Sequence, residues 1–146
     1  MDSPTPAADI ERPPYLALKA VMMPRDTNPH GTIFGGVILS YIDQAGVGGA
    51  QREIRLRGWP DRMLVTVAMK SIEFHRAVWV GDVVSFFTCV VRVGRTSLTM
   101  HVSVDTERGG TCVHLTDAEV TYVAVEGQPQ EHRPVPICGL PGAAQA

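Results

Sequence analysis

The chain has 146 residues, of which 45% are apolar and 19% charged, a balance that predicts one globular domain. A formal net charge of −2 argues against binding nucleic acid through bulk positive charge, and no apolar run is long enough to cross a membrane. The N-terminus lacks a signal-peptide pattern, and Cys89, Cys112 and Cys138 have no metal-ligand spacing, so we expect a cytoplasmic protein with reduced thiols and no bound metal.

The first half of the chain predicts a strand, a loop and one long helix. Residues 1–14 are rich in Pro and Ala, which predicts disorder, and residues 137–146 predict a flexible tail, leaving 15–136 as the folded domain. A strand is expected over Tyr15–Met23 and a helix over Gly36–Leu56. The helix contains Gly46, Gly48 and Gly49, which disfavour helix by about 1 kcal/mol each relative to Ala and therefore predict a close approach to another backbone.

The second half predicts four strands and no helix. They are expected over 63–74, 82–93, 98–105 and 112–125, with hairpin signals at Gly94-Arg95-Thr96 and Arg108-Gly109-Gly110. In the last strand the apolar phase slips near Asp117, which predicts a bulge. Strand, long helix and four strands with short links favour an α+β architecture, an antiparallel sheet with the helix on one face.

The loop before the helix and its first half carry candidate catalytic groups. Turn-forming residues from Asp26 to Gly31, Asn28 among them, lead into the pair Gly35-Gly36. Backbone N–H groups at a helix start lack intrahelical partners and lie at the positive end of the helix dipole, so this pair predicts an oxyanion hole. Asp43 is the one acid on an otherwise uncharged helical stripe, which favours a catalytic carboxylate over a solvated one.

Six segments in order resemble the hot-dog-fold acyl-CoA thioesterases, specifically the group with the bacterial YciA-type and brain acyl-CoA hydrolases. They are Pro24-Arg-Asp-Thr-Asn28, Gly31-Thr-Ile-Phe-Gly-Gly36, Asp43, Ser71-Ile-Glu-Phe-His-Arg-Ala-Val78, Val80-Gly-Asp82 and Val93-Gly-Arg-Thr-Ser97. The resemblance spans about residues 15–136. One departure is Ala77, where the family commonly has proline.

The resemblance implies a five-stranded sheet wrapped around one helix, in homodimers with active sites between protomers that often form trimers of dimers. Asp43 then holds the position of the catalytic acid, either as nucleophile or as general base, and Asn28 assists it. Arg95, Thr96 and Ser97 are implied to hold the coenzyme A moiety. Arg76 and Lys70 are weaker candidates for the same role, because Lys and Arg suit phosphate groups.

Helix geometry alone also favours a shared site. Seven residues of helix separate Gly36 from Asp43, a rise of about 10 Å. Both groups must lie within about 3–3.5 Å of one reacting carbonyl, which two facing protomers can achieve more easily than one helix. Together with the resemblance, which implies hydrolysis of acyl-CoA without a cofactor, this geometry leads us to expect an acyl-CoA thioester hydrolase that acts as a dimer.

Two other functions are weighed against hydrolysis. A dehydratase or hydratase of acyl thioesters typically uses a His–acid pair, and no histidine lies near the helical stripe. A non-catalytic acyl-CoA sensor is disfavoured because both Asp43 and Asn28 are present. Ser40 lacks the G-x-S-x-G elbow of serine hydrolases, and the five histidines show no ligand or triad spacing.

Overall fold

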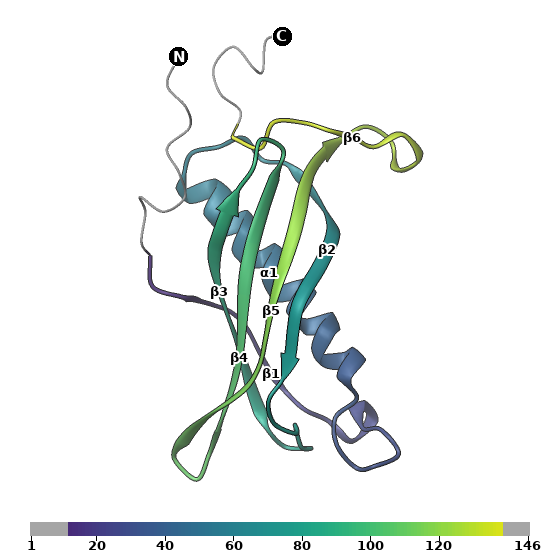
Figure 1. The fold of residues 1–146 in the computed structure, drawn as a ribbon, viewed down its shortest axis with the longest axis vertical. Coiled ribbons are helices and arrows are strands. Elements are labelled where there is room, and N and C mark those ends of the chain that lie inside the picture. Colours follow the sequence, from purple (N-terminus) through teal and green to yellow (C-terminus); the bar gives the residue numbers. More distant parts are fainter. Residues whose placement is uncertain (1–11, 139–146) are drawn as a thin grey trace.

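One long helix lies against a six-stranded antiparallel sheet in the computed structural model, which describes residues 12–138 (Figure 1). The elements are β1 (Tyr15–Val21), α1 (Gly35–Leu56), β2 (Met63–Phe74), β3 (Val83–Val93), β4 (Ser97–Arg108), β5 (Thr111–Glu126) and β6 (Arg133–Pro134). Short 3₁₀ turns at Pro24–Asp26 and Pro129–Glu131 complete the order. The predicted α+β architecture is therefore confirmed.

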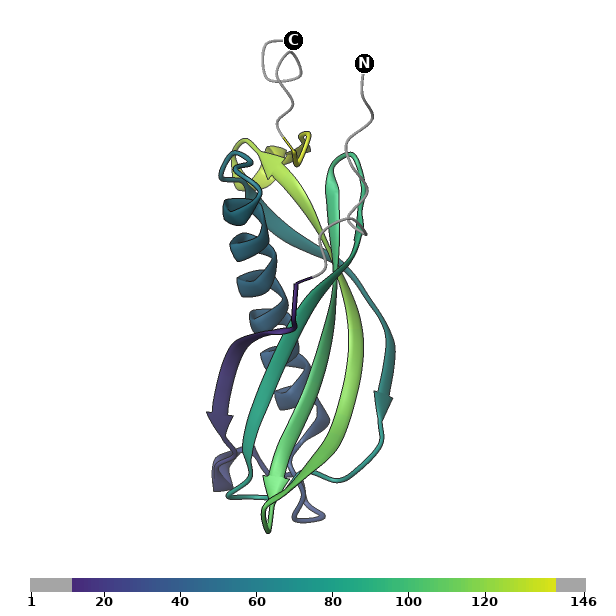
Figure 2. The same cartoon turned by 90° about the vertical axis from the view of Figure 1, so that its left-hand side faces the viewer.

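The main path of the sheet runs β1-β3-β4-β5-β2, with β6 added to the end of β5. Every pairing is antiparallel, and the β3–β4 and β4–β5 links are the two predicted hairpins. Seen from the side, the sheet curls around α1 (Figure 2). This is the hot-dog arrangement that the resemblance implied. None of the helices within residues 12–138 is long and apolar enough to span a bilayer.

The core fills the space between α1 and the concave face of the sheet. The helix buries Ile38, Ile42 and Ala45 against inward side chains of β4 and β5. Two helical glycines allow this close packing: an added Cβ at Gly46 would overlap the Tyr122 hydroxyl, and one at Gly49 would overlap Thr88.

The predicted reason for the helical glycines needs correction. The close approach to Gly46 and Gly49 comes from sheet side chains, whereas a neighbouring backbone had been expected. Gly48 meets nothing within 4 Å among the described residues, so the same reason does not apply to it. A curled sheet presents its side chains end-on to the helix, and bulky ones therefore reach the helical backbone first.

The predicted bulge in β5 is confirmed. Val104 of β4 pairs with Thr116 while the next residue, Asp105, pairs with His114, so β5 has one residue more than its partner at this point. Leu115 and Thr116 are consecutive and both fully buried, which breaks the alternation of the strand. A second irregularity interrupts β2 between Lys70 and Glu73, where Ser71 adopts a φ of 56°.

The predicted end segments fall mostly outside the described residues, which exclude 1–11 and 139–146. The domain boundaries at 15 and 136 therefore stay a prediction. Next to the second boundary, Ile137 is fully buried, and its N–H donates to the carbonyl oxygen of Arg95 at 3.0 Å.

Candidate active site

Asp43 lies in the middle of α1, half-buried, and its orientation is fixed by the sheet. The Thr66 hydroxyl of β2 donates to Asp43 Oδ1 at 2.7 Å. The Tyr122 hydroxyl of β5 lies 2.8 Å from the carbonyl oxygen of Asp43 and 3.2 Å from the same Oδ1. One carboxylate oxygen is therefore held by two neutral donors, which leaves Oδ2 without a hydrogen bond from the described residues.

Tyr122 is suited to hold Asp43 because it remains a neutral donor. Burial and the adjacent Asp43 carboxylate both raise the pKa of the Tyr122 phenol far above its ordinary value. Its ring is fully buried in the core, so the hydroxyl is a fixed point against which the carboxylate is positioned. The arrangement therefore orients the carboxylate through two hydroxyl groups, with no cation against it among the described residues.

The helix start at Gly35-Gly36 is open. Phe34 occupies the N-cap position and makes no side-chain hydrogen bond to the helix. Among the described residues, no hydrogen bond uses the N–H of Gly35 or Gly36. Gly35 borders a cleft of about 260 Å³, which is also lined by Thr32, Ile33, Ile38 and the segment Phe74–Val78, and Gly36 is the next residue of the helix.

Asn28 organises the loop that precedes this helix start. Its Oδ1 accepts from the N–H groups of His30 at 2.9 Å and Thr32 at 3.2 Å, and its Nδ2 donates to the Thr32 hydroxyl at 2.7 Å. Because Thr32 lines the cleft, Asn28 shapes the site through this neighbour. One Nδ2 hydrogen has no partner among the described residues, and Asn28 makes no contact with Asp43 of its own chain.

A partly buried ion pair between Asp82 and Arg108 supports the wall of the cleft. Asp82 accepts from Arg108 Nη2 at 2.5 Å and from the Trp79 N–H at 2.8 Å, and Arg108 also donates to the Ala77 carbonyl oxygen at 2.9 Å. Burial alone would raise the pKa of Asp82, but the hydrogen bonds from Arg108 and Trp79 outweigh it and lower the pKa. Ala77, the departure from the family pattern, is thus held through its backbone.

The candidate coenzyme A residues lie in three separate places. Arg76 borders the cleft beside Gly35, and Lys70 is exposed on β2. Arg95, Thr96 and Ser97 form the β3–β4 hairpin tip, beyond the other end of α1 (Figure 1). Since α1 has 22 residues and is about 33 Å long, one chain does not bring the hairpin to its own cleft.

Asp43 lies beside an unpaired sheet edge. β2 pairs with β5 on one side and with no other described strand on its second side. Apolar side chains along β2 are exposed there, with Met63 at 53% and Val67 at 55% exposure. Thr66, which holds Asp43, is the neighbour of Val67, so the carboxylate faces the same region as this apolar edge.

Sequence reasoning missed the two residues that hold Asp43. Tyr122 lies among the apolar residues of the last strand, where a buried phenol needs a hydrogen-bond partner and so signals a nearby polar group. Thr66 gave no signal, because threonine is common in strands.

Comparisons with known proteins agree with this fold. A sequence profile of the thioesterase superfamily matches residues 30–113. The acyl-CoA thioester hydrolase YciA of Salmonella typhimurium is 37% identical over 131 residues, which cover 85% of this chain and 92% of the relative. A hexameric hot-dog-fold thioesterase of Campylobacter jejuni superposes with a TM-score of 0.71 at 39% identity, covering 83% of this chain and 88% of that one. An acyl-CoA hydrolase of Bacillus cereus also gives a TM-score of 0.71, at 32% identity, with 83% and 70% covered.

Proposed function

This chain belongs to the thioesterase superfamily, and we propose that it hydrolyses acyl-CoA thioesters to a free acid and coenzyme A at sites shared between two protomers. One observation carries the proposal. A fixed carboxylate, Asp43, and a row of free backbone donors, Gly35-Gly36, occupy one helix at positions too far apart to serve the same carbonyl.

The roles follow from charge and geometry. The N–H groups of Gly35 and Gly36 receive the thioester oxygen as it becomes negative, each contributing roughly 3–4 kcal/mol in the transition state. Asp43 of the facing protomer attacks the carbonyl carbon or removes a proton from the attacking water. The C–S bond then breaks, the coenzyme A thiolate takes up a proton, and water supplies the new acid oxygen. This reaction draws on no metal or redox cofactor.

The free edge of β2 supports pairing between two copies. An exposed apolar edge strand is a template for another strand, and a two-fold axis beside β2 would align two such edges antiparallel. The two α1 helices then run antiparallel, so the start of one lies toward the later part of the other. Such a dimer brings Asp43 of one chain toward Gly36 of its partner.

Coenzyme A binding follows from the same antiparallel arrangement. Arg76 lies at the cleft and offers a cation to the phosphates. The partner's hairpin at Arg95, Thr96 and Ser97, which is remote from the cleft in its own chain, comes closer to it across the axis. Lys70 on the β2 edge is a further basic contact.

Higher assembly and location are part of the proposal. The Campylobacter jejuni relative is hexameric, and we assign a trimer of dimers to this chain by analogy. The free thiols of Cys89, Cys112 and Cys138 suit the reducing cytoplasm, where acyl-CoA substrates are made and used.

Subunit mixing tests the shared site. Asp43→Ala and Asn28→Ala variants, each inactive alone, are mixed under conditions that exchange subunits, and thiol release from acyl-CoA is followed. A mixed dimer has one site with both lesions and one site with neither, so equal mixing should restore about a quarter of wild-type activity. Each variant mixed with itself is the control. If native mass spectrometry proves exchange and no activity returns, each site belongs to one chain.

A further inference from the structure

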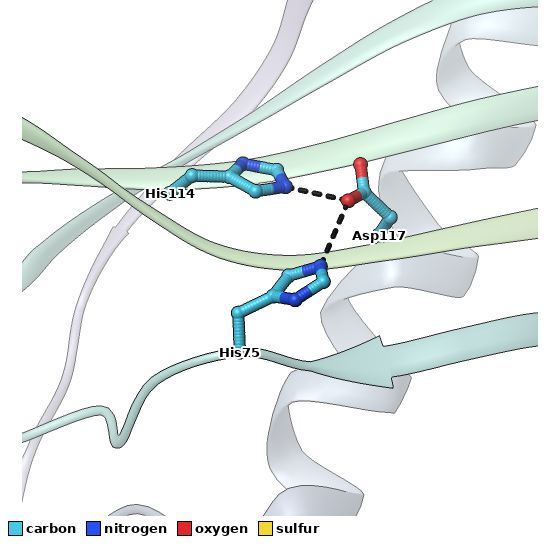
Figure 3. Close-up of side chains that lie close together, drawn as sticks. All are labelled: His75, His114 and Asp117. Atoms are coloured by element: carbon cyan, nitrogen blue, oxygen red, sulfur yellow. Dashed lines mark hydrogen bonds and ion pairs between the residues drawn. The ribbon is translucent and has the colours of Figure 1, made fainter.

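Three side chains from two strands converge on the outer face of the sheet, away from α1 (Figure 3). His75 follows β2, and His114 and Asp117 belong to β5. Asp117 Oδ2 lies 2.5 Å from His114 Nε2 and 3.2 Å from His75 Nε2. One donor atom from each residue lies within 4.8 Å of the others. None of the three residues bonds Asp43, although His75 also lines the cleft beside Gly35.

The β5 bulge creates this cluster. In a regular strand, residues three apart such as His114 and Asp117 point to opposite faces. The extra residue at Leu115–Thr116 reverses the alternation, so both side chains face outward. The His75 N–H donates to the Leu115 carbonyl oxygen at 2.8 Å, which holds the third member beside the bulge. Sequence spacing could not reveal a ligand set assembled in this way.

Surrounding side chains orient the cluster. His114 Nδ1 lies 2.7 Å from Asp105 Oδ1 on β4, so the ring donates its Nδ1 proton to this carboxylate and turns Nε2 toward Asp117. A carboxylate behind a metal-binding histidine typically fixes the tautomer in this manner. On the other side, His101 Nε2 lies 3.1 Å from Asp117 Oδ1.

Each ring nitrogen of His114 faces a carboxylate oxygen, Nδ1 that of Asp105 at 2.7 Å and Nε2 that of Asp117 at 2.5 Å. A neutral His114 with its proton on Nδ1 would aim the Nε2 lone pair at a carboxylate oxygen 2.5 Å away, which is repulsive. A proton or a metal ion relieves this repulsion. Two imidazoles and one carboxylate suit zinc and similar divalent ions.

We propose that His75 Nε2, His114 Nε2 and Asp117 Oδ2 bind one divalent transition-metal ion, with zinc as the best fit. Ligand atoms around tetrahedral zinc lie about 3.3 Å apart, given bond lengths of about 2.0–2.2 Å. The His75–Asp117 separation of 3.2 Å already matches, and the His114–Asp117 contact widens by less than about 1 Å. All three side chains are partly exposed, so solvent completes the coordination and the ion has an entry path.

Metal binding would also act on the cleft, an effect that rests on the proposed function. His75 stands between Phe74 and Arg76, and all three residues line the cleft beside Gly35. An ion that ties His75 to β5 fixes this wall relative to the sheet. The metal is therefore structural, on the far side of the wall from the reacting carbonyl.

Direct binding measurements test the site without using activity. The full chain is stripped with a chelator and titrated with Zn²⁺ by calorimetry, and with Co²⁺ by visible absorption. We expect one ion per chain, with no sulfur charge-transfer band in the Co²⁺ spectrum. His114→Ala and Asp117→Asn should each weaken binding at least tenfold, and Asp105→Asn should weaken it by about 10–100-fold through the tautomer.

Two controls separate this site from other ligands. His132→Ala removes an exposed histidine outside the cluster, and Cys112→Ser removes an exposed thiol, and both should bind as the wild type does. Circular dichroism checks that each variant folds, and His75→Ala replaces His114→Ala if that variant does not. Absence of metal uptake by the wild type shows that the cluster holds a proton only. Equal affinity in the folded ligand variants would likewise overturn the proposal.

Discussion

The middle and the start of α1 differ in how far the chain satisfies its own polar groups. At Asp43 the sheet supplies two donors to one carboxylate oxygen, and at Gly46 the Tyr122 hydroxyl fills the space that a side chain would need. At the helix start, Gly35 lines a cleft, and the N–H groups of Gly35 and Gly36 have no acceptor among residues 12–138.

The middle of the helix thus positions the Asp43 carboxylate, whereas the start of the helix is available to bind the substrate. The middle of the helix is pre-organised at Asp43, Gly46 and Gly49, because the buried residues Tyr122 and Thr88 of the sheet lie against these positions. The start of the helix is built from a loop, exposed aromatic rings and unused N–H groups, and so it can accept a ligand. A substitution that adds a side chain in the middle of the helix should therefore lower stability, whereas the same substitution at its start should lower kcat/KM.

Asp43→Asn should lower kcat at least about a hundredfold, because the amide can neither attack nor accept a proton. Thr66 and Tyr122 can still donate to the amide oxygen, so the fold should persist. Thiol-release kinetics and a thermal unfolding curve measure the two effects. Near wild-type turnover in the folded variant would remove Asp43 from the mechanism.

Gly46→Ala should destabilise the fold by about 2 kcal/mol, because its Cβ would overlap the hydroxyl of fully buried Tyr122. The overlap exceeds the gain of roughly 1 kcal/mol from helix propensity. Urea unfolding measures the loss. Adding Tyr122→Phe removes the overlapping oxygen and should restore part of the stability; if it restores none, the contact is not the cause.

Asp82→Asn should cost about 1–2 kcal/mol at neutral pH by weakening its bonds to Arg108. The folded pKa of Asp82 is lowered, so its stabilising effect is complete above its ordinary value of 3.8 and disappears as pH falls through the folded pKa. Denaturant unfolding of both proteins from pH 7 to pH 3 should therefore converge at the acidic end. A difference that stays constant below pH 4 contradicts this linkage.

Gly36→Ala tests the start of the helix with the same change made at Gly46. Its Cβ would approach the Phe34 ring to 2.8 Å, but this ring is 55% exposed and free to move, so stability should change little. The added methyl group stands where the thioester approaches the N–H groups, and we expect kcat/KM to fall about tenfold. Gln44→Ala, on the exposed side of the helix, is the control. If Gly36→Ala lost as much stability as Gly46→Ala, the start of the helix would be as tightly packed as its middle, and the proposed difference between the two regions would be wrong.

Arg95→Ala should raise KM for acyl-CoA about three- to fivefold and leave kcat nearly unchanged, since phosphates far from the thioester contribute uniform binding. Arg76→Ala, beside the cleft, serves as the comparison and should show at least the same rise. Steady-state kinetics over an acyl-CoA series measures both. A collapse of kcat in Arg95→Ala would place the hairpin in the chemical step.

Much of the fold was predictable because the decisive signals are local. Alternation located the strands, the glycine-containing helical stripe located α1, and the phase slip near Asp117 located the bulge. The uncharged helical stripe pointed to Asp43 and the glycine pair to the helix start, and the resemblance implied the same catalytic role for Asp43. Tyr122 and Thr66 were missed as partners of Asp43, because their contact joins positions 79 and 23 residues away from it.

The histidine cluster shows a different limit of sequence reasoning. His75, His114 and Asp117 have no ligand spacing in the chain, and only the register between β2 and β5 brings them together. A bulge was predicted, but the face that each residue near it would occupy depends on which residue is the extra one. The packing of both Leu115 and Thr116 in the core determines which residue is the extra one and therefore which neighbours face outward.

The unpaired edge of β2 has a consequence for the lifetime of the protein. Residues 63–69 form a run with no charge, proline or glycine, the composition that favours stacking into fibrils when it is exposed. In the proposed assembly a partner covers this run. A dissociated subunit therefore exposes an edge strand that can pair with the same strand of any other dissociated subunit. Inactivation on dilution should then be irreversible and should accelerate with the concentration of freed subunits. Storing the enzyme at high concentration, which keeps the subunits paired, would protect it.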